Sequence, residues 1–172
     1  VMSAISGAVM WIPLYLFIAW AVQRKYGWKS LLAFIVCLGL AMGLADIVAG
    51  IFKHSGLLKN LWPSFPARLR PMHTPELEGL VHVVKQGGMY GTVSAHAATI
   101  VSLAVLTSKI IRLRWFTWLM IGVSVLICYS RIYLACHFPQ DILIGATLGV
   151  ASGLVGYWIF TRVLRFSKKA QQ

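Results

Sequence analysis

Residues 130–141 read Ser-Arg-Ile-Tyr-Leu-Ala-Cys-His-Phe-Pro-Gln-Asp and connect two apolar runs. This stretch holds one cation, Arg131, one imidazole, His137, and one carboxylate, Asp141. Pro139 prevents a continuous helix, and Asp141 suits the start of the next helix, because a helix N-terminus carries partial positive charge. Asp141 follows His137 by four residues, close enough to accept a hydrogen bond from one ring nitrogen and raise the basicity of the other. The arrangement predicts that His137 acts as a nucleophile or a base.

A polar loop with one hydrogen-bonded histidine is the alternative interpretation, and the composition decides against it. The chain of 172 residues is 59% hydrophobic and only 12% charged, which excludes an ordinary soluble globule. The net charge of +12 is compatible with nucleic-acid binding, but the basic residues flank apolar runs, as in membrane proteins. Clustered ionisable groups are costly in a membrane, so a functional role is favoured. We expect one domain over residues 1–172 that lies in the lipid bilayer and binds no nucleic acid.

Apolar runs of sufficient length predict an all-α, polytopic transmembrane helix bundle with five spans. The runs cover residues 4–22, 30–53, 94–111, 115–132 and 141–163. Pro13 is expected to kink or end the first part of the first run. The fifth run contains a stripe of small residues for close helix packing, made of Gly145, Gly149 and Gly153.

The polar segment 54–92 contains four prolines, which forbid a long helix. Its short apolar part, residues 57–62, is expected to lie in the membrane interface. Surface ion pairs are expected between acidic and basic residues of this segment, with Glu76 and Glu78 pairing with Arg68 or Lys85.

Basic residues are divided unevenly between the connections. Of the 16 Lys and Arg residues, those after the first, third and fifth runs are Arg24, Lys25, Lys29, Lys109, Arg112, Arg114, Arg162, Arg165, Lys168 and Lys169. Cytoplasmic loops carry such an excess, so these connections are expected to be cytoplasmic and the N-terminus outside. The opposite side holds all four acidic residues together with Lys53, Lys59, Arg68, Arg70, Lys85 and Arg131. Cations on the translocated side need a partner, and a phosphate is the natural candidate.

Three polar segments should meet at this outer face: Lys53 with Arg70-Pro71, residues 93–96, and the stretch 130–141. Ser94 suits an N-cap, which leaves backbone N–H groups free to bind phosphate. Cations and N–H groups can stabilise the extra charge of a phosphoryl-transfer transition state. Two histidines can then divide the chemistry, one attacking phosphorus and the other protonating the leaving oxygen.

The order and spacing of these segments resemble the membrane branch of the type 2 phosphatidic acid phosphatase superfamily. The third family motif matches in full, from Ser-Arg at 130–131 through His137 to Asp141. The second motif, usually Pro-Ser-Gly-His, reads Val93-Ser94-Ala95-His96, so Pro and Gly are replaced.

The first family motif, Lys, six residues, Arg-Pro, is present only in part. Arg70-Pro71 is kept, but the position of the lysine is occupied by Pro63. We expect an insertion between residues 56 and 66 with Lys53 as the partner; Lys59, with a shorter insertion, is the alternative.

The resemblance implies a lipid phosphatase with six helices, so an N-terminal helix is expected to be missing from the five visible here. It implies that His137 forms a phosphohistidine, that Asp141 orients it, and that His96 protonates the leaving alcohol and then activates water. The phosphoryl oxygens would be held by Lys53, Arg70, Ser94 and Arg131. The family needs no metal, and the resemblance implies no cofactor.

Residues 70–92 look most like bacterial members that act on lipid phosphates. This likeness implies an enzyme of the bacterial inner membrane with its site facing the periplasm. Its expected substrate is phosphatidylglycerophosphate, phosphatidic acid, undecaprenyl pyrophosphate or lipid A phosphate. The alternatives are a lipid phosphotransferase that uses the same phosphohistidine and a non-catalytic lipid-binding membrane protein.

Overall fold

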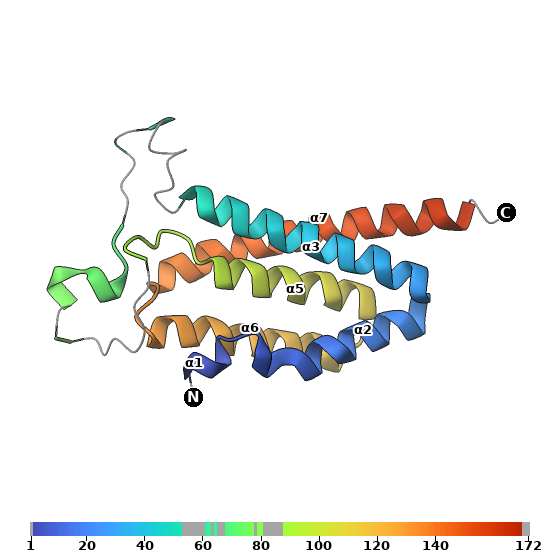
Figure 1. The fold of residues 1–172 in the computed structure, drawn as a ribbon, viewed down its shortest axis with the longest axis horizontal. Helices are drawn as coiled ribbons and strands as arrows, with labels where there is room; N and C mark the ends of the chain where they lie inside the picture. Colours follow the sequence, from blue (N-terminus) through green and yellow to red (C-terminus); the bar gives the residue numbers. More distant parts are fainter. Residues whose placement is uncertain are drawn as a thin grey trace.

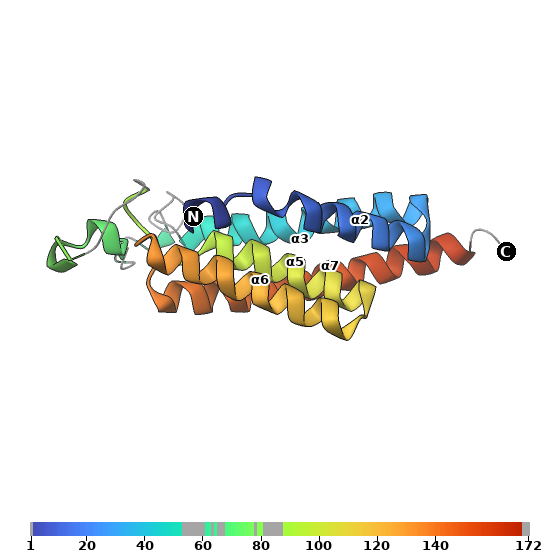
Figure 2. The same cartoon turned by 90° about the horizontal axis from the view of Figure 1, so that it is seen from below.

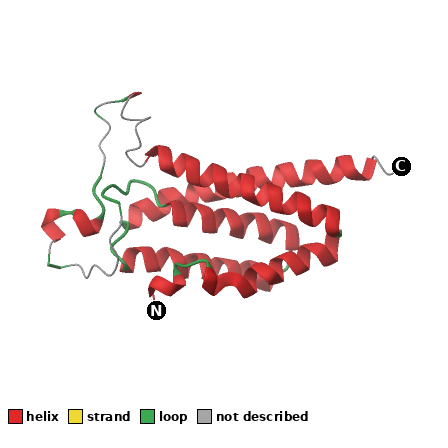
Figure 3. Cartoon of the chain, viewed as in Figure 1, coloured by secondary structure: helices red, strands yellow, loops and turns green. Residues whose placement is uncertain are grey.

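The computed structural model describes residues 2–52, 61–62, 64, 68–77, 79–80 and 88–169. Its longer helices are α2 (Ile12–Tyr26), α3 (Trp28–Phe52), α5 (Ala95–Ile111), α6 (Arg114–Tyr133) and α7 (Pro139–Lys169). Its short helices are α1 (Met2–Ile5), η1 (Val9–Trp11), η2 (Pro71–His73) and η3 (Pro75–Leu77). The long helices form an elongated bundle (Figure 1), and the described residues contain no strand (Figure 3). The predicted all-α class is thus confirmed.

Within the described residues, three helices are long and apolar enough to cross a membrane: α3, α6 and the part of α7 from Pro139 to Phe166. The apolar helix α5 has 17 residues and α2 has 15. Large hydrophobic side chains cover the outside of the bundle, among them Leu32, Ile47, Val125 and Leu143, each more than 60% exposed. A helical bundle with such an apolar exterior is an integral membrane protein, because helices satisfy their own backbone hydrogen bonds in lipid.

The first predicted span is interrupted. After α1 the chain turns at residues 6–8, passes through η1, and starts α2 at Ile12 with Pro13 in its first turn. Proline is well tolerated there because the first N–H groups of a helix have no intrahelical partner. The indole N–H of Trp11 donates to the Ile5 carbonyl at 2.8 Å and closes the turn. The interruption that Pro13 predicts therefore occurs just before this residue.

The centre of the bundle is α5, which packs against α3, α6 and α7 (Figure 2). The glycine stripe lies where α7 meets α5: a Cβ on Gly145 would lie 2.5 Å from the Ser94 carbonyl oxygen, and one on Gly149 would lie 2.5 Å from the Ala98 carbonyl oxygen. No side chain fits at these distances, so the predicted small-residue packing is confirmed. This approach brings the start of α7 against the start of α5.

The two ends of the bundle differ. We call one the basic end; it holds the α2–α3 turn at Gly27, the α5–α6 connection at 112–113 and the last turns of α7 (Figure 1). The other, the site end, holds residues 68–77 and 88–94 and the α6–α7 connection at 134–138 (Figure 1). All connections that the count of basic residues predicts to be cytoplasmic lie together at the basic end.

Candidate active site

Backbone hydrogen bonds fix the end of α6. The N–H of Cys136 donates to the Arg131 carbonyl at 3.0 Å, and that of Ala135 donates to the Ile132 carbonyl at 2.9 Å. This pair of bonds is the Schellman motif, whose capping residue has a left-handed conformation; here it is Ala135, with φ 53°. The motif places Arg131 in the last turn of α6 and His137 directly after the cap.

The next helix begins with a proline and a capping carboxylate. Pro139 is the first residue of α7 and Asp141 the third. Oδ2 of Asp141 accepts a hydrogen bond from the Phe138 N–H at 3.0 Å, as in a capping box. Asp141 is fully buried. The structure agrees with the predicted position of Asp141 at a helix start, although α7 begins two residues earlier because proline fits its first position.

His137 is buried, with 2% exposure. Its Nδ1 lies 3.5 Å from Oδ2 of Asp141. Burial lowers the pKa of His137; Asp141 opposes this effect, while the positive charges of Arg70 and Arg131 add to it. The lowered pKa keeps the imidazole neutral near pH 7, which is the form a nucleophile requires.

Arg68 corrects a sequence-based prediction. The sequence predicts ion pairs of Glu76 and Glu78 with Arg68 or Lys85, but the Arg68 guanidinium forms an ion pair with Oδ1 of Asp141. Glu78 and Lys85 lie outside the described residues. Arg68 also donates to the side-chain oxygen of Gln140 at 2.5 Å and lies over the Phe138 ring at 5.0 Å. A guanidinium can bind two acceptors and stack at once. Arg68 thus holds the carboxylate that faces His137.

Two short extended segments pair at the site end. Leu69 and Tyr90 form an isolated antiparallel bridge, with the N–H of Arg70 donating to the Met89 carbonyl at 3.0 Å and the N–H of Gly91 donating to the Arg68 carbonyl at 3.1 Å. The Nε of Arg70 donates to the Tyr90 carbonyl at 3.0 Å. This pairing carries Arg68 and Arg70 to the α6–α7 connection.

Arg70 lies among the residues of this connection. Burial lowers the pKa of Arg70, and Cys136, Arg131 and Asp141 are close enough to affect it electrostatically. The N–H of Met72 donates to the Ala135 carbonyl at 3.2 Å. The structure therefore brings Arg70 together with Arg131, His137 and Asp141, as the motif spacing predicts.

Gly91 is a site residue that the sequence analysis did not single out. A Cβ at this position would lie 2.7 Å from Cγ of Arg70 and 3.4 Å from Nδ1 of His137. Glycine is the residue that permits such a close approach of backbone and side chains. The available signal was the glycine-rich run 87–91, Gly-Gly-Met-Tyr-Gly.

Ser94 is the N-cap of α5, as predicted. Its Oγ accepts a hydrogen bond from the Ala97 N–H at 3.3 Å, and its own N–H donates to the Asp141 carbonyl at 3.1 Å. Ser94 is fully buried, and its neighbours Val93 and Ala95 are buried as well. The second motif is therefore connected to the third through the backbone of Ser94 and Asp141.

His96 is the second residue of α5 and is exposed. It lines a cavity of about 260 Å³ together with residues from the α1–α2 region, α3, α5 and α6, and His137 is not among the lining residues. The joint action of His96 and His137 therefore stays a prediction. Lys53 and Lys59, and residues 57–60 of the expected interfacial segment, lie outside the described residues.

Comparisons with known proteins agree with the motifs. The family model of the PAP2 superfamily matches residues 34–165. A lipid A 4'-phosphatase from Bacteroides thetaiotaomicron is 31% identical over 160 residues, which are 92% of this chain and 68% of that protein. A lipid A 4'-phosphatase from Porphyromonas gingivalis is 38% identical over 106 residues, 60% of this chain and 44% of that protein. No solved structure matches the chain.

The family match spans most of the chain and includes the second and third motifs. Both relatives carry the names of lipid phosphatases. The predicted family and enzyme class are confirmed: the chain belongs to the PAP2 superfamily, among its lipid phosphatases.

Proposed function

We propose that this protein removes the phosphomonoester of a lipid A-type substrate without a metal ion, through a phosphohistidine on His137. The names of the two relatives support the choice of lipid A phosphate over the other lipid phosphates considered. The observation that carries the proposal is a buried, neutral His137 with Asp141 behind it and Arg68, Arg70 and Arg131 around it.

The charges of this cluster suit a phosphoryl group. Asp141 is the one carboxylate that the described residues bring into contact with Arg68 and His137. The Nε atom of Arg131 is buried and donates to no described residue. Buried donors without acceptors are costly, and phosphoryl oxygens would accept from guanidinium groups with good geometry.

In the first step the ring nitrogen of His137 that faces away from Asp141 attacks phosphorus. The new P–N bond forms as the ester P–O bond breaks, and the leaving lipid oxygen takes a proton from His96. Arg70 and Arg131 stabilise the charge on the phosphoryl oxygens. Asp141 stabilises the positive charge that the attack creates on the ring of His137.

In the second step water attacks phosphorus on the opposite side from His137. His96 accepts the water proton, the P–N bond breaks, and inorganic phosphate leaves with His137 neutral again. The same residue thus serves first as general acid and then as general base. Ser94 assists as the cap that fixes the start of α5 next to Asp141.

We propose that the site end faces the periplasm of a bacterial inner membrane. The excess of Lys and Arg at the basic end supports a cytoplasmic location for that end. A fluorescent-protein fusion at the C-terminus tests this orientation: it is expected to fluoresce, since the C-terminus follows the basic end. A C-terminal alkaline phosphatase fusion that is active instead would reverse the assignment.

The central experiment measures phosphate release by the purified protein from lipid A bearing a 4'-phosphate, with EDTA present. Phosphatidic acid, phosphatidylglycerophosphate and undecaprenyl pyrophosphate are compared at equal concentration. Lipid A is expected to be the preferred substrate. His137→Ala is expected to lower the rate at least about a thousandfold, while the matched variant His73→Ala keeps it.

Single-turnover labelling separates the chemical steps. Substrate labelled in its phosphoryl group should leave an acid-labile label on the wild-type chain and none on His137→Ala. Full phosphate release by His137→Ala would overturn the nucleophile assignment. Transfer of the label to another lipid without free phosphate would favour a phosphotransferase instead.

A further inference from the structure

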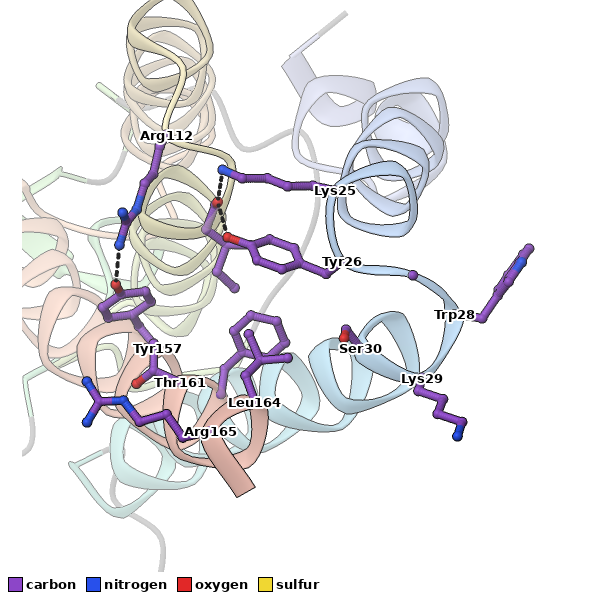
Figure 4. Close-up of a pocket in the computed structure, with 13 residues that line it drawn as sticks. Lys25, Tyr26, Trp28, Lys29, Ser30, Arg112, Tyr157, Thr161, Leu164 and Arg165 are labelled. Atoms are coloured by element: carbon purple, nitrogen blue, oxygen red, sulfur yellow. Dashed lines mark hydrogen bonds between the residues drawn. The ribbon is translucent and has the colours of Figure 1, made fainter. Parts of the chain in front are cut away.

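A second cavity lies at the basic end, where the α2–α3 turn and the end of α5 meet the last turns of α7 (Figure 4). Its volume is about 640 Å³. The basic residues that line it are Lys25, Lys29, Arg112 and Arg165. Its apolar lining residues include Leu164, which is half-buried, and Ile110 and Phe160, which are almost fully buried. The cavity thus has both basic and apolar lining residues.

In the described part of the chain, no carboxylate lines this cavity. Of the four acidic residues of the chain, Asp46, Glu76 and Asp141 are described, and none of these three is in the lining. Two of these basic residues donate to neutral acceptors. Lys25 Nζ donates to the carbonyls of Ile110 and Ile111, each at 3.0 Å, and Arg112 donates to the Tyr157 hydroxyl at 3.0 Å. Figure 4 shows the bond between Arg112 and Tyr157 and one of the two Lys25 bonds. The described lining of the cavity is therefore suited to an anionic group.

The other two basic residues of the lining have no polar partner in the described part of the chain. Lys29 and Arg165 are exposed and form no hydrogen bond or ion pair with the described part of the chain. They extend from α3 and from α7 in different directions, and Lys29 points away from the other labelled basic residues (Figure 4). Long, flexible side chains at these positions can close over a bound group from two helices. Substitution of either residue should therefore remove no structural contact.

Membrane topology alone does not explain this arrangement. The excess of basic residues that orients a membrane protein depends on their number in a loop, whereas here cations from three separate segments line one cavity. Trp28, also in the lining, is 69% exposed and extends outward (Figure 4). Exposed tryptophan at a helix end is typical of headgroup depth in a bilayer.

We propose that this cavity binds the phosphate of an anionic phospholipid headgroup, in the leaflet opposite the one that faces the active site. The cations bind the phosphate, and the exposed Trp28 ring and the Leu164 side chain contact the first carbons of the lipid. A soluble phosphate would gain nothing from these apolar contacts. The proposal does not depend on the catalytic assignment, because no residue of the site end takes part.

Native mass spectrometry of the full chain in detergent tests the proposal by titration with phosphatidylglycerol. One bound molecule is expected, with zwitterionic phosphatidylcholine binding much more weakly. The double variant Lys29→Gln, Arg165→Gln should weaken phosphatidylglycerol binding about 10- to 30-fold, on the basis of the attraction of each basic side chain for anionic lipid. The matched control is Arg24→Gln, Arg114→Gln, which removes the same charge from exposed residues of the same end that do not line the cavity.

The control should bind phosphatidylglycerol like the wild-type chain, and all variants should keep the wild-type unfolding temperature. Equal weakening in the control would overturn the proposal, because bulk charge would then explain binding. Equal affinity for phosphatidylcholine would overturn it as well. Displacement of the lipid by sn-glycerol 3-phosphate at an equal concentration would replace the lipid assignment with a site for a soluble phosphate.

Discussion

Nδ1 of His137 lies 3.5 Å from Oδ2 of Asp141, and both side chains are almost completely buried. This distance is long for a hydrogen bond to a charged acceptor. The position of the carboxylate therefore matters more than the strength of its contact with the ring. Two other groups hold that carboxylate, the N–H of Phe138 and the guanidinium of Arg68.

Arg68→Gln removes the ion pair with Asp141 and the stacking on Phe138. We expect kcat to fall about tenfold, because a lost charge-assisted hydrogen bond costs about 1.5 kcal/mol or more. KM for the lipid should change little. Arg68→Lys should restore only part of kcat, since lysine cannot reach two acceptors and stack. An unchanged kcat with a raised KM would instead place Arg68 in direct contact with substrate.

The pH dependence should follow the ionisation of His137. Its pKa is lowered by burial and by Arg70 and Arg131, so the acid limb of kcat/KM should lie below the ordinary histidine value of about 6.5. Arg131→Gln removes one like charge, which favours the imidazolium; the pKa rises and the limb moves to higher pH. Arg131→Lys keeps the charge and should keep the limb in place.

Both profiles should be measured on the same substrate, so that the substrate's own ionisation, at about pH 6, contributes equally. A limb that moves to lower pH in Arg131→Gln would contradict the electrostatic coupling between this residue and His137.

Gly91→Ala should impair catalysis more than folding. Its Cβ would lie 2.7 Å from Cγ of Arg70, so the arginine must move away from His137. A displacement of this kind is expected to lower kcat/KM about 10- to 100-fold. Gly88→Ala is the matched control, because its Cβ would meet only the end of the Arg70 side chain, at 3.9 Å. Equal losses in the two variants would show that loop flexibility is responsible rather than contact.

Gly149→Ala should destabilise the bundle. The new Cβ would lie 2.5 Å from the Ala98 carbonyl oxygen and 2.8 Å from Cβ of Val101. Overpacking of this kind costs about 1–3 kcal/mol, which unfolding by a denaturing detergent can measure. Gly122→Ala in α6 meets nothing within 4 Å and should be neutral or up to about 1 kcal/mol stabilising. Equal stability of the two variants would mean that α5 and α7 can separate without cost.

Much of the fold could be read from local features of the sequence. Apolar runs that are long enough to cross the bilayer must be helical, because lipid offers no hydrogen-bond partner for the backbone. The stretch 130–141 determines its own cap, turn and helix start through hydrogen bonds within a few residues. Ser94 likewise caps its own helix. The break that the sequence predicts at Pro13 lies a few residues before it in the structure, because proline begins a helix as readily as it ends one.

The contacts of the site required the tertiary structure. Nothing local to Arg68 distinguishes Asp141, at a sequence separation of 73 residues, from the nearer glutamates as its partner. The pairing of residues 68–70 with 89–91 decides the choice, and it also places Gly91 against His137.

By itself, then, the sequence determined the helical membrane bundle, the family, and the internal geometry of the stretch from Arg131 to Asp141. The tertiary structure decided which arginine holds Asp141, where His96 lies, and that four cations line a cavity at the basic end. The reason is physical: helix length, caps and turns depend on neighbours in the chain, whereas ion pairs and cavities depend on how distant segments pack.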